Sequence, residues 1–374
     1  MKRLAFLLLV TVLLVAGCSL HANGNVSDTD ELDRMIGQMV MVGFRGLDAG
    51  PGSPVADDIR AGVGGVILFS KDCVLSSPVR NIADPAQLKA LTASLQGYAE
   101  IPLFIAVDQE GGRISRLSPE NGFPATMSAA EIGNSGDPGA AFRSGKLIGR
   151  TMKEEGLNLD FAPVVDVNRN PGNPVIAGLQ RSFSNDPETV AVLAEAFIKG
   201  LHSEGVLSCI KHFPGHGSSE GDSHKGFTDV TGTWSREELL PFEKLIRDGR
   251  TDMVMTAHIF NAELDPDNPA TLSHRVISDL LRGDMGFDSI VITDDMGMGA
   301  ISNIYGFKEA VLKAVNAGAD IILLGNNLTY EPNPGIRAVD TIRELVHEGR
   351  ISERRIRRSY ERIMRVKKRM QLSD

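Results

Sequence analysis

The stretch PLFIAVDQEGG, residues 102–112, is an apolar run that ends abruptly in charged residues and glycines. A near-continuous apolar run of this kind is typical of a parallel strand that is buried on both of its faces. Asp108 stands where the apolar run stops, and Glu110 follows it. The stretch therefore predicts a buried strand that delivers carboxylates to one end of a parallel sheet.

Seven other runs of the same kind are distributed along the chain, and helix-like segments separate them. The other strand candidates are residues 37–44, 63–69, 157–167, 205–213, 251–258, 288–295 and 319–325. The clearest helical patterns are residues 85–100, 187–205 and 307–320. Eight strands, each followed by a crossover segment, predict an α/β protein with a single (β/α)₈ TIM-type barrel. A doubly wound open sheet is the alternative, because a strand count taken from sequence can err by one or two.

The bulk composition is that of an ordinary globular protein. The 374 residues include 42% hydrophobic and 23% charged residues, and the net charge is −9. A nucleic-acid-binding protein would show a basic footprint, so no nucleic-acid partner is expected. No feature indicates an obligate protein partner. Apart from Cys18, only Cys73 and Cys209 remain, which is too few for a disulfide framework, and Cys209 lies in an apolar run typical of a buried thiol.

The N-terminus has the form of a secretory signal. Two basic residues precede an apolar run, residues 4–16, that is too short to span a bilayer. The run ends in LVAGC, which resembles the bacterial lipobox, with Val15 in place of the commoner Leu. We expect an exported protein held on a membrane by lipid at Cys18; a plain secretory signal cut elsewhere is the alternative. The predicted organisation is a signal peptide, a tether and a barrel domain: residues 1–17, 18–30 and 31–374.

The C-terminal segment, residues 351–370, is predicted to be a basic amphipathic helix. Ile356, Tyr360 and Ile363 recur at helical spacing, and most of the remaining positions are Arg or Lys. Such a helix can lie on a membrane surface. A solvated helix packed on the outside of the barrel is the favoured interpretation, because charge runs usually coat ordinary surfaces.

Polar residues gather where the apolar runs stop. In a β/α barrel the carboxyl ends of the strands form the active-site mouth, so these residues predict a polar concave site. Structural alternatives exist for several of them. One Asp of an adjacent pair can cap the next helix, the acidic and basic residues after residue 107 can form ion pairs, and His258 can be structural. The residues are Asp108, Glu110, Arg113, Arg116, Lys211, His212, His258, Asp294 and Asp295.

The loop KHFPGHGSSEGDSHKGF, residues 211–227, holds three of the eight histidines, and its residues suit two functions. A metal site could use His212, His216 and His224 with Asp222. The interposed proline and glycines break the helix that the spacing of the first two would need, so no metal and no cofactor are expected. The favoured function is acid–base chemistry by an Asp222–His224 dyad, because a carboxylate orients an imidazole and stabilises its charged form. The glycines would let the loop close and reopen.

Asp294, at a rigid strand end, is the corresponding candidate for a nucleophile.

Taken together, these motifs resemble bacterial β-N-acetylglucosaminidases of glycoside hydrolase family 3. The resemblance covers residues 31–369 and is carried by DQEGGRISRL (108–117), KHFPGHG with DSHKG, TAHI (256–259), DPDNPATLS (265–273) and TDDMGMGAI (293–301). It implies Asp294 as nucleophile and His224, with Asp222, as acid/base. The residues that it implies for sugar binding are Asp108, Arg116, Arg181, Lys211 and His212.

The implied activity is retaining, exo-acting hydrolysis of β-N-acetylglucosaminides, either cell-wall muropeptides or chitooligosaccharides. A family β-glucosidase, a phosphorylase that uses phosphate as acceptor, and a sugar-binding protein without catalysis are the alternatives. QRSF (180–183) departs from the more usual NRSF of the family, which leaves Arg181 in place but puts the setting of its loop in doubt.

Overall fold

The computed structural model describes residues 28–371, and within them eight parallel strands form one sheet. Their order in the sheet is β10-β1-β2-β3-β6-β7-β8-β9, so neighbours in the chain are neighbours in space. All eight strands lie inside the predicted apolar runs. The strands are β1 Val40–Gly43, β2 Gly65–Ile67, β3 Phe104–Val107, β6 Leu159–Asp160, β7 Leu207–Phe213, β8 Met253–Thr256, β9 Ile290–Thr293 and β10 Ile322–Leu324.

The two edges of this sheet meet, which closes it into a barrel. Ile292 of β9 forms a parallel bridge with Ile321, the residue before β10. The N–H of Thr293 donates to the carbonyl of Ile321 at 3.0 Å, and the N–H of Asp320 donates to the carbonyl of Val291 at 2.7 Å. The fold is therefore the predicted (β/α)₈ barrel and not an open sheet. A short hairpin, β4 Gln109–Gly111 with β5 Ile114–Ser115, follows β3.

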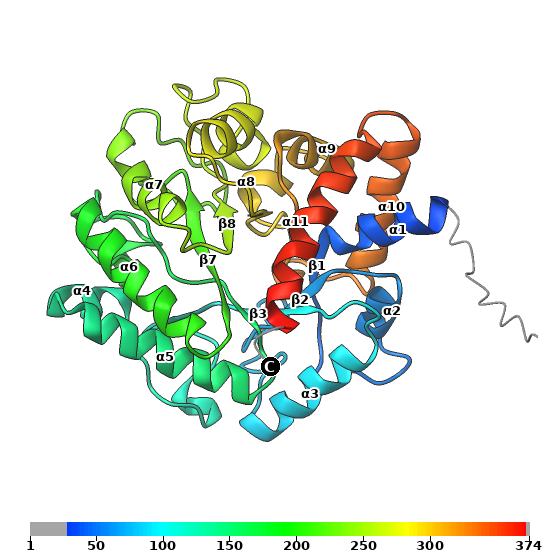
Figure 1. The fold of residues 1–374 in the computed structure, drawn as a ribbon, viewed down its shortest axis with the longest axis horizontal. Helices are drawn as coiled ribbons and strands as arrows, with labels where there is room; N and C mark the ends of the chain where they lie inside the picture. Colours follow the sequence, from blue (N-terminus) through cyan, green and yellow to red (C-terminus); the bar gives the residue numbers. More distant parts are fainter. Residues whose placement is uncertain (1–27, 372–374) are drawn as a thin grey trace, which may run out of the picture.

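Each barrel strand is followed by a helical segment on the outside of the sheet (Figure 1). The three clearest predicted helices are present, each ending three residues earlier than expected. Three of the helices, α3, α5 and α6, begin with Asp-Pro, where the Asp carboxylate accepts a backbone N–H and the proline stands at the first helical position. The helices are α1 Asp28–Gln38, α2 Pro54–Arg60, α3 Pro85–Gly97, α4 Ala129–Ser135, α5 Pro138–Glu154, α6 Pro187–His202, α7 Leu240–Arg247, the π-helix η5 Arg275–Asp284, α8 Gly299–Ser302, α9 Phe307–Ala317, α10 Pro334–His347 and α11 Glu353–Gln371.

Helix α11 lies across the N-terminal end of the barrel, where Figure 1 shows it passing in front of the strands. Ile356 and Ile363 are buried and Tyr360 is partly buried, as the helical spacing predicted. Part of its positive charge is not simply solvated, because basic side chains pair with carboxylates that stand just before strands. These pairs are Arg355 with Asp320, Arg365 with Asp288, and Arg369 with Asp252. The helix therefore closes one end of the barrel and leaves the carboxyl ends of the strands at the other.

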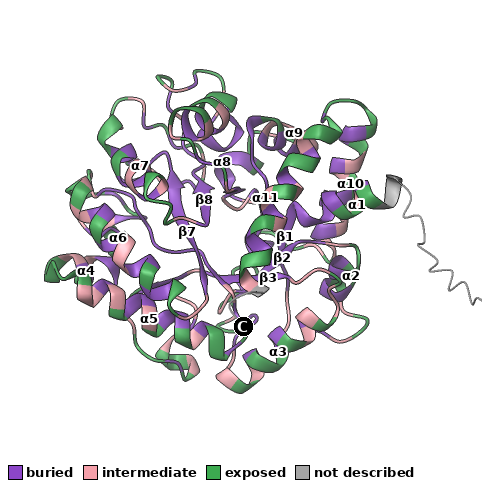
Figure 2. Ribbon diagram, in the orientation of Figure 1, coloured by how far each residue is buried: buried purple, intermediate pink, exposed green. Residues whose placement is uncertain are grey.

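The core consists of the strands and the inward faces of the helices, while the outward helix faces are exposed (Figure 2). Cys209 lies inside this core as a free thiol, as predicted, and burial raises its pKa. The predicted signal peptide, the lipidation site Cys18 and most of the tether lie outside the described residues. Within residues 28–371, no helix is both long enough and apolar enough to cross a membrane.

Lys367 of α11 is an unusual buried amine at the closed end of the barrel. Its Nζ donates to Gln38 Oε1 and to the carbonyl of Gly64, both at 2.7 Å, and lies 4.8 Å from the ring centre of Phe104. Burial lowers the pKa of Lys367 to about 7. The unfolded chain would keep this proton up to about pH 10.4, so the unfolded state binds more protons than the folded state between these values.

The contribution of Lys367 to the free energy of unfolding should therefore rise with pH across this window. We expect the free energy of unfolding of the wild type, relative to Lys367→Met, to rise by up to about 1.4 kcal/mol per pH unit between pH 7 and 10. Urea denaturation of both proteins over this pH range measures the difference. Lys368→Met, at the exposed neighbouring position, is the control and should show no such slope. A difference that stays flat with pH would contradict a buried neutral Lys367.

Candidate active site

A cavity of about 380 Å³ opens at the carboxyl ends of the strands, and the predicted site residues gather in it. They come from the segments that follow β3, β6 and β9, and from β7 itself with the loop after it. Asp222 does not line the cavity, but its carboxylate is hydrogen-bonded to His224, which does. The predicted residues on the wall are Asp108, Arg116, Arg181, Lys211, His212, His224 and Asp294.

Two ionised carboxylates and three cations form one network in this cavity. Lys211 Nζ lies 2.7 Å from Asp108 Oδ1 and 2.8 Å from Glu110 Oε1. Arg181 binds Glu110 through two parallel hydrogen bonds of 2.8 Å, and Arg116 lies 3.2 Å from Asp108 Oδ2. Burial alone would raise the pKa of both carboxyl groups, but the neighbouring cations hold both pKa values below their usual range. The cluster is therefore charged and offers donors and acceptors to a polar ligand.

The ion pairs considered from the sequence are found only in part. Asp108 does pair with Arg116, but Arg113 donates instead to the carbonyl of Gly178. The main partners of the two carboxylates are Lys211 and Arg181, which arrive from distant parts of the chain.

Lys211 and His212 both face the cavity although they are consecutive in β7. Side chains in a regular strand alternate between faces. The register of β7 against β8 shifts between Ile210 and Phe213, and such an irregularity redirects a side chain. His212 Nε2 then lies 3.2 Å from Arg181 Nη2, so this histidine joins the charged network.

Asp166 orients His212, and it was not among the predicted site residues. Its Oδ2 lies 2.7 Å from His212 Nδ1, and its Oδ1 accepts the backbone N–H groups of His212 and His216 at 3.1 and 2.8 Å. Burial would raise the pKa of Asp166, but His212 outweighs it and the pKa is lowered. A lone aspartate in the apolar run FAPVVDV was the available signal.

Asp294 follows β9 directly and is partly buried on the cavity wall. Its N–H donates to the carbonyl of Thr256 at 3.2 Å, and its Oδ1 accepts the N–H of Asp295 at 2.8 Å. Burial would raise its pKa, but the nearby His258, together with other histidines, lowers it. Asp294 is thus an ionised carboxylate with one oxygen left for chemistry, on a strand end that cannot easily move.

The neighbouring Asp295 is structural, but the expectation that one member of the pair caps the next helix is wrong. Its Oδ1 accepts the N–H groups of Gly297 and Gly325, which ties the turn after β9 to the end of β10. It caps this turn and not helix α8, whose N-cap is Met298. His258 is also structural, since its nitrogens bond to Thr271 Oγ1 and to the carbonyl of Asp295, both at 2.9 Å.

Asp222 and His224 form the predicted dyad. Asp222 Oδ1 lies 2.9 Å from His224 Nδ1 and also accepts the His224 backbone N–H at 3.0 Å. Burial raises the pKa of Asp222, but the hydrogen bond from His224 and the imidazole charge lower it overall. The side chain of His224 is 50% exposed, so a proton on Nε2 can be exchanged with a ligand.

The glycines of this loop divide into two groups. Gly215 has φ +118°, which side-chain-bearing residues rarely adopt, and a Cβ on Gly217 would lie 1.7 Å from the carbonyl oxygen of Val167. These two glycines are required by local geometry and packing. Gly221 and Gly226 flank the dyad and have more open surroundings. Any bending of the loop is therefore expected at the second pair.

Two of the imidazoles that a metal site in this loop would use, those of His212 and His216, are already hydrogen-bonded to other side chains. His212 binds Asp166, and His216 Nδ1 and Nε2 lie 2.8 Å from Ser219 Oγ and 3.1 Å from Ser223 Oγ. Across residues 28–371, no group of three or more His, Cys, Asp or Glu side chains is arranged to hold a metal ion.

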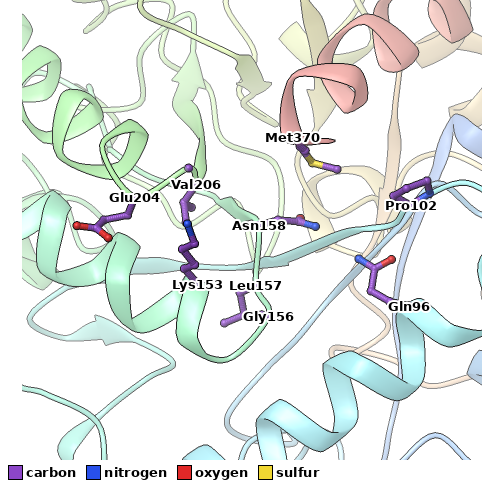
Figure 3. A pocket seen from close by; sticks show the side chains of 10 residues that line it. Gln96, Pro102, Lys153, Gly156, Leu157, Asn158, Glu204, Val206 and Met370 are labelled. Carbon is purple, nitrogen blue, oxygen red and sulfur yellow. The ribbon is translucent and has the colours of Figure 1, made fainter. Parts of the chain in front are cut away.

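A second cavity, of about 440 Å³, lies at the opposite end of the barrel near the end of α11 (Figure 3). Lys153 and Glu204 stand at its edge, and Asn158 is bonded to the backbone of Leu103 and Ile105. It is the larger cavity, but it contains none of the predicted site residues. Chemistry and not volume therefore identifies the cavity at the carboxyl ends as the candidate active site.

Comparison with known proteins matches residues 31–366 to the family described as "Glycosyl hydrolase family 3 N terminal domain". The chain belongs to glycosyl hydrolase family 3. Among curated proteins, this family 3 chain is 40% identical over 270 residues to a beta-hexosaminidase of Tolumonas auensis, covering 71% of this chain and 76% of the relative. It is 36% identical over 329 residues to beta-hexosaminidase A of Pseudoalteromonas piscicida, covering 78% and 53% of the two chains.

A solved structure, a glycoside hydrolase family 3 beta-N-acetylglucosaminidase from Paenibacillus sp. strain FPU-7, superposes with a TM-score of 0.83 at 39% identity. The match covers 92% of this family 3 chain and 63% of that one. The chain thus spans about half the length of the Pseudoalteromonas relative and under two thirds of the Paenibacillus chain.

The QRSF departure from the more usual NRSF places Gln180 in a backbone conformation that residues with side chains rarely adopt. Gln180 has φ +61°, in the left-handed region, where asparagine is better tolerated than glutamine. The loop nevertheless delivers Arg181 to Glu110 with both hydrogen bonds intact. The substitution therefore leaves the predicted sugar-binding arginine in place.

Proposed function

We propose that this family 3 chain is a retaining exo-β-N-acetylglucosaminidase. The observation that carries the proposal is the sharing of one cavity by an ionised carboxylate, Asp294, and an imidazole with its own carboxylate, His224 with Asp222. Two such groups on separate loops can act on one glycosidic bond as nucleophile and as acid/base. The names of the relatives support the same substrate class.

In the first step Asp294 attacks the anomeric carbon, and the bond from that carbon to the leaving oxygen breaks. The Nε2–H of protonated His224 gives its proton to that oxygen, and a glycosyl-aspartate ester forms. In the second step neutral His224 takes a proton from water, the water oxygen attacks the anomeric carbon, and Asp294 leaves as a carboxylate. Asp222 stabilises the imidazolium of the first state and keeps the ring in one tautomer.

The charged cluster would bind the terminal sugar. Asp108, held by Lys211 and Arg116, suits sugar hydroxyls, which both donate and accept hydrogen bonds. Arg181 and His212, which contact each other, suit the N-acetyl group. Muropeptides and chitooligosaccharides both present such a terminal residue, so both remain substrates in the proposal.

A panel of aryl β-glycosides with and without the 2-acetamido group tests the proposed function. We expect turnover of the aryl β-N-acetylglucosaminide and a kcat/KM at least about tenfold lower for the matching β-glucoside, because the acetamido contacts are lost. Proton NMR should show the β-anomer of N-acetylglucosamine released first. Release of the α-anomer would rule out retention.

The same assay separates the alternatives. Formation of N-acetylglucosamine 1-phosphate in phosphate buffer would identify a phosphorylase, and loss of turnover after EDTA treatment would identify a metal-dependent hydrolase. Binding without turnover would identify a sugar-binding protein.

A further inference from the structure

The segment that carries the dyad, residues 221–226, is held against helix α8 by few contacts. The N–H of Ala300 donates to the carbonyl of Ser223, and the N–H of Gly299 donates to the carbonyl of His224, both at 3.2 Å. The side chain of Ser223 is buried, whereas His224 and Lys225, which follow it, are exposed. Ser223 is therefore the inward anchor of this segment.

The hydroxyl of Ser223 is hydrogen-bonded to the ring of His216. Nε2 of His216 lies 3.1 Å from Ser223 Oγ, and Nδ1 lies 2.8 Å from Ser219 Oγ. His216 is 3% exposed, and burial lowers its pKa to about 4, so the ring is neutral. A neutral imidazole offers one donor and one acceptor, and a hydroxyl can complement either. Both ring nitrogens are thus used to hold the loop, and neither is available to a ligand.

Two buried carboxyl groups hold the backbone of the loop at His216 and Gly217. Asp166 accepts the backbone N–H of His216, and Glu238 Oε2 accepts the N–H of Gly217 at 3.1 Å. Asp166 also binds His212, which contacts Arg181. A continuous chain of hydrogen bonds therefore runs from the proposed sugar-binding cluster through Asp166 and His216 to the residue between Asp222 and His224.

We propose that His216 and Ser223 are positioning residues that hold the Asp222–His224 dyad at the cavity. The inference rests on the proposed function for the role of the dyad, but the docking of the segment is a separate property. Without the Ser223 hydroxyl, the segment keeps the two backbone hydrogen bonds from Gly299 and Ala300 as its ties to α8 and loses its tie to His216. The docked population should then fall, and with it the fraction of enzyme in which His224 can protonate a leaving group.

Ser223→Ala tests the proposal, because it removes one hydroxyl and adds no bulk. We expect kcat/KM for N,N′-diacetylchitobiose, whose leaving group needs a proton, to fall about tenfold, and kcat/KM for an activated aryl N-acetylglucosaminide to fall less than about twofold. Ser208→Ala is the matched control. Ser208 is fully buried at the other end of β7, and its Oγ lies 3.1 Å from Asp252 Oδ2, so it loses a comparable bond far from the cavity. It should show no difference between the two substrates.

Hydrogen exchange gives a second reading that does not depend on catalysis. The amides of Gly299 and Ala300 should exchange faster in Ser223→Ala than in the wild type, and His216→Gln should show the same increase and the same substrate dependence. Equal losses on both substrates, or unchanged exchange at these two amides, would overturn the positioning role. If exchange is faster in Ser223→Ala but the wild type turns over neither substrate, the docking role of Ser223 stands and the proposed function is refuted.

Discussion

Asp294→Asn is expected to lower kcat on an activated aryl N-acetylglucosaminide by on the order of 10⁴-fold or more, the scale seen when a covalent nucleophile is removed. The amide has nearly the same shape as the carboxylate and can still accept the N–H of Asp295. It carries no negative charge, so it can neither form the glycosyl ester nor stabilise the positive charge that develops on the sugar ring. Initial rates over a substrate range, with circular dichroism to verify folding, provide the measurement.

Asp295→Asn is the matched control, because the same chemical change is made one residue away. The Oδ1 of an asparagine at 295 can still accept the N–H groups of Gly297 and Gly325 that Asp295 accepts. Activity within about tenfold of the wild type is expected, since those hydrogen bonds position the turn and are individually worth about 1 kcal/mol. Comparable losses in the two variants would show that the whole turn, and not the charge of Asp294, is what the reaction needs.

The strands and the general place of the site were predictable because both follow from local sequence. A buried parallel strand reads as a short apolar run, and a polar residue directly after it must lie at the mouth. This reasoning located Asp108, Lys211 and Asp294 correctly on the cavity wall. It depends only on strand ends, which the barrel brings together whatever the loops do.

The longer-range partners in and around the site were not predictable, because they come from distant parts of the chain. Asp166 looks like a strand residue in its own run, and only the pairing of β6 with β7 brings it to His212. The identity of the capping aspartate depends on Gly325, which is 30 residues away from Asp295. His216 looked like a metal ligand or a flexible-loop residue, but its ring is buried between two serines. Sequence spacing could show that these groups were present but not which atoms they would meet.

The charge run of α11 illustrates the same limit at the other end of the barrel. Its helical spacing predicted the buried Ile356 and Ile363, but the carboxylates that pair with its arginines stand before three different strands. Asp252, for example, binds Arg369 and also His202. Like Asp222–His224 and Asp166–His212, Asp252–His202 is a hydrogen-bonded Asp–His pair, but it lies far from the cavity, and it therefore offers a control.

His224→Ala is expected to lower kcat/KM for N,N′-diacetylchitobiose by about 10²- to 10⁴-fold, which is the range that general acid catalysis supplies. An activated aryl N-acetylglucosaminide should lose much less in kcat/KM, because its leaving group departs without a proton. Its kcat should still fall, because the second step has lost the base that activates water. Burst kinetics, with a rapid release of one equivalent of phenolate per enzyme, should then appear.

Reaction with azide distinguishes the loss of the catalytic base in His224→Ala from damage to the fold. Azide is an anion that needs no deprotonation, so it should attack the accumulated ester of Asp294 in His224→Ala and raise kcat while yielding the β-glycosyl azide. His202→Ala removes the imidazole of an Asp–His pair outside the cavity, in which His202 Nε2 lies 2.7 Å from Asp252 Oδ2, and it should retain wild-type kinetics without an azide effect. If His224→Ala loses activity equally on both substrates and azide does not increase its rate, the dyad is not the acid/base. The exposed position of His224 would then have to serve ligand binding instead.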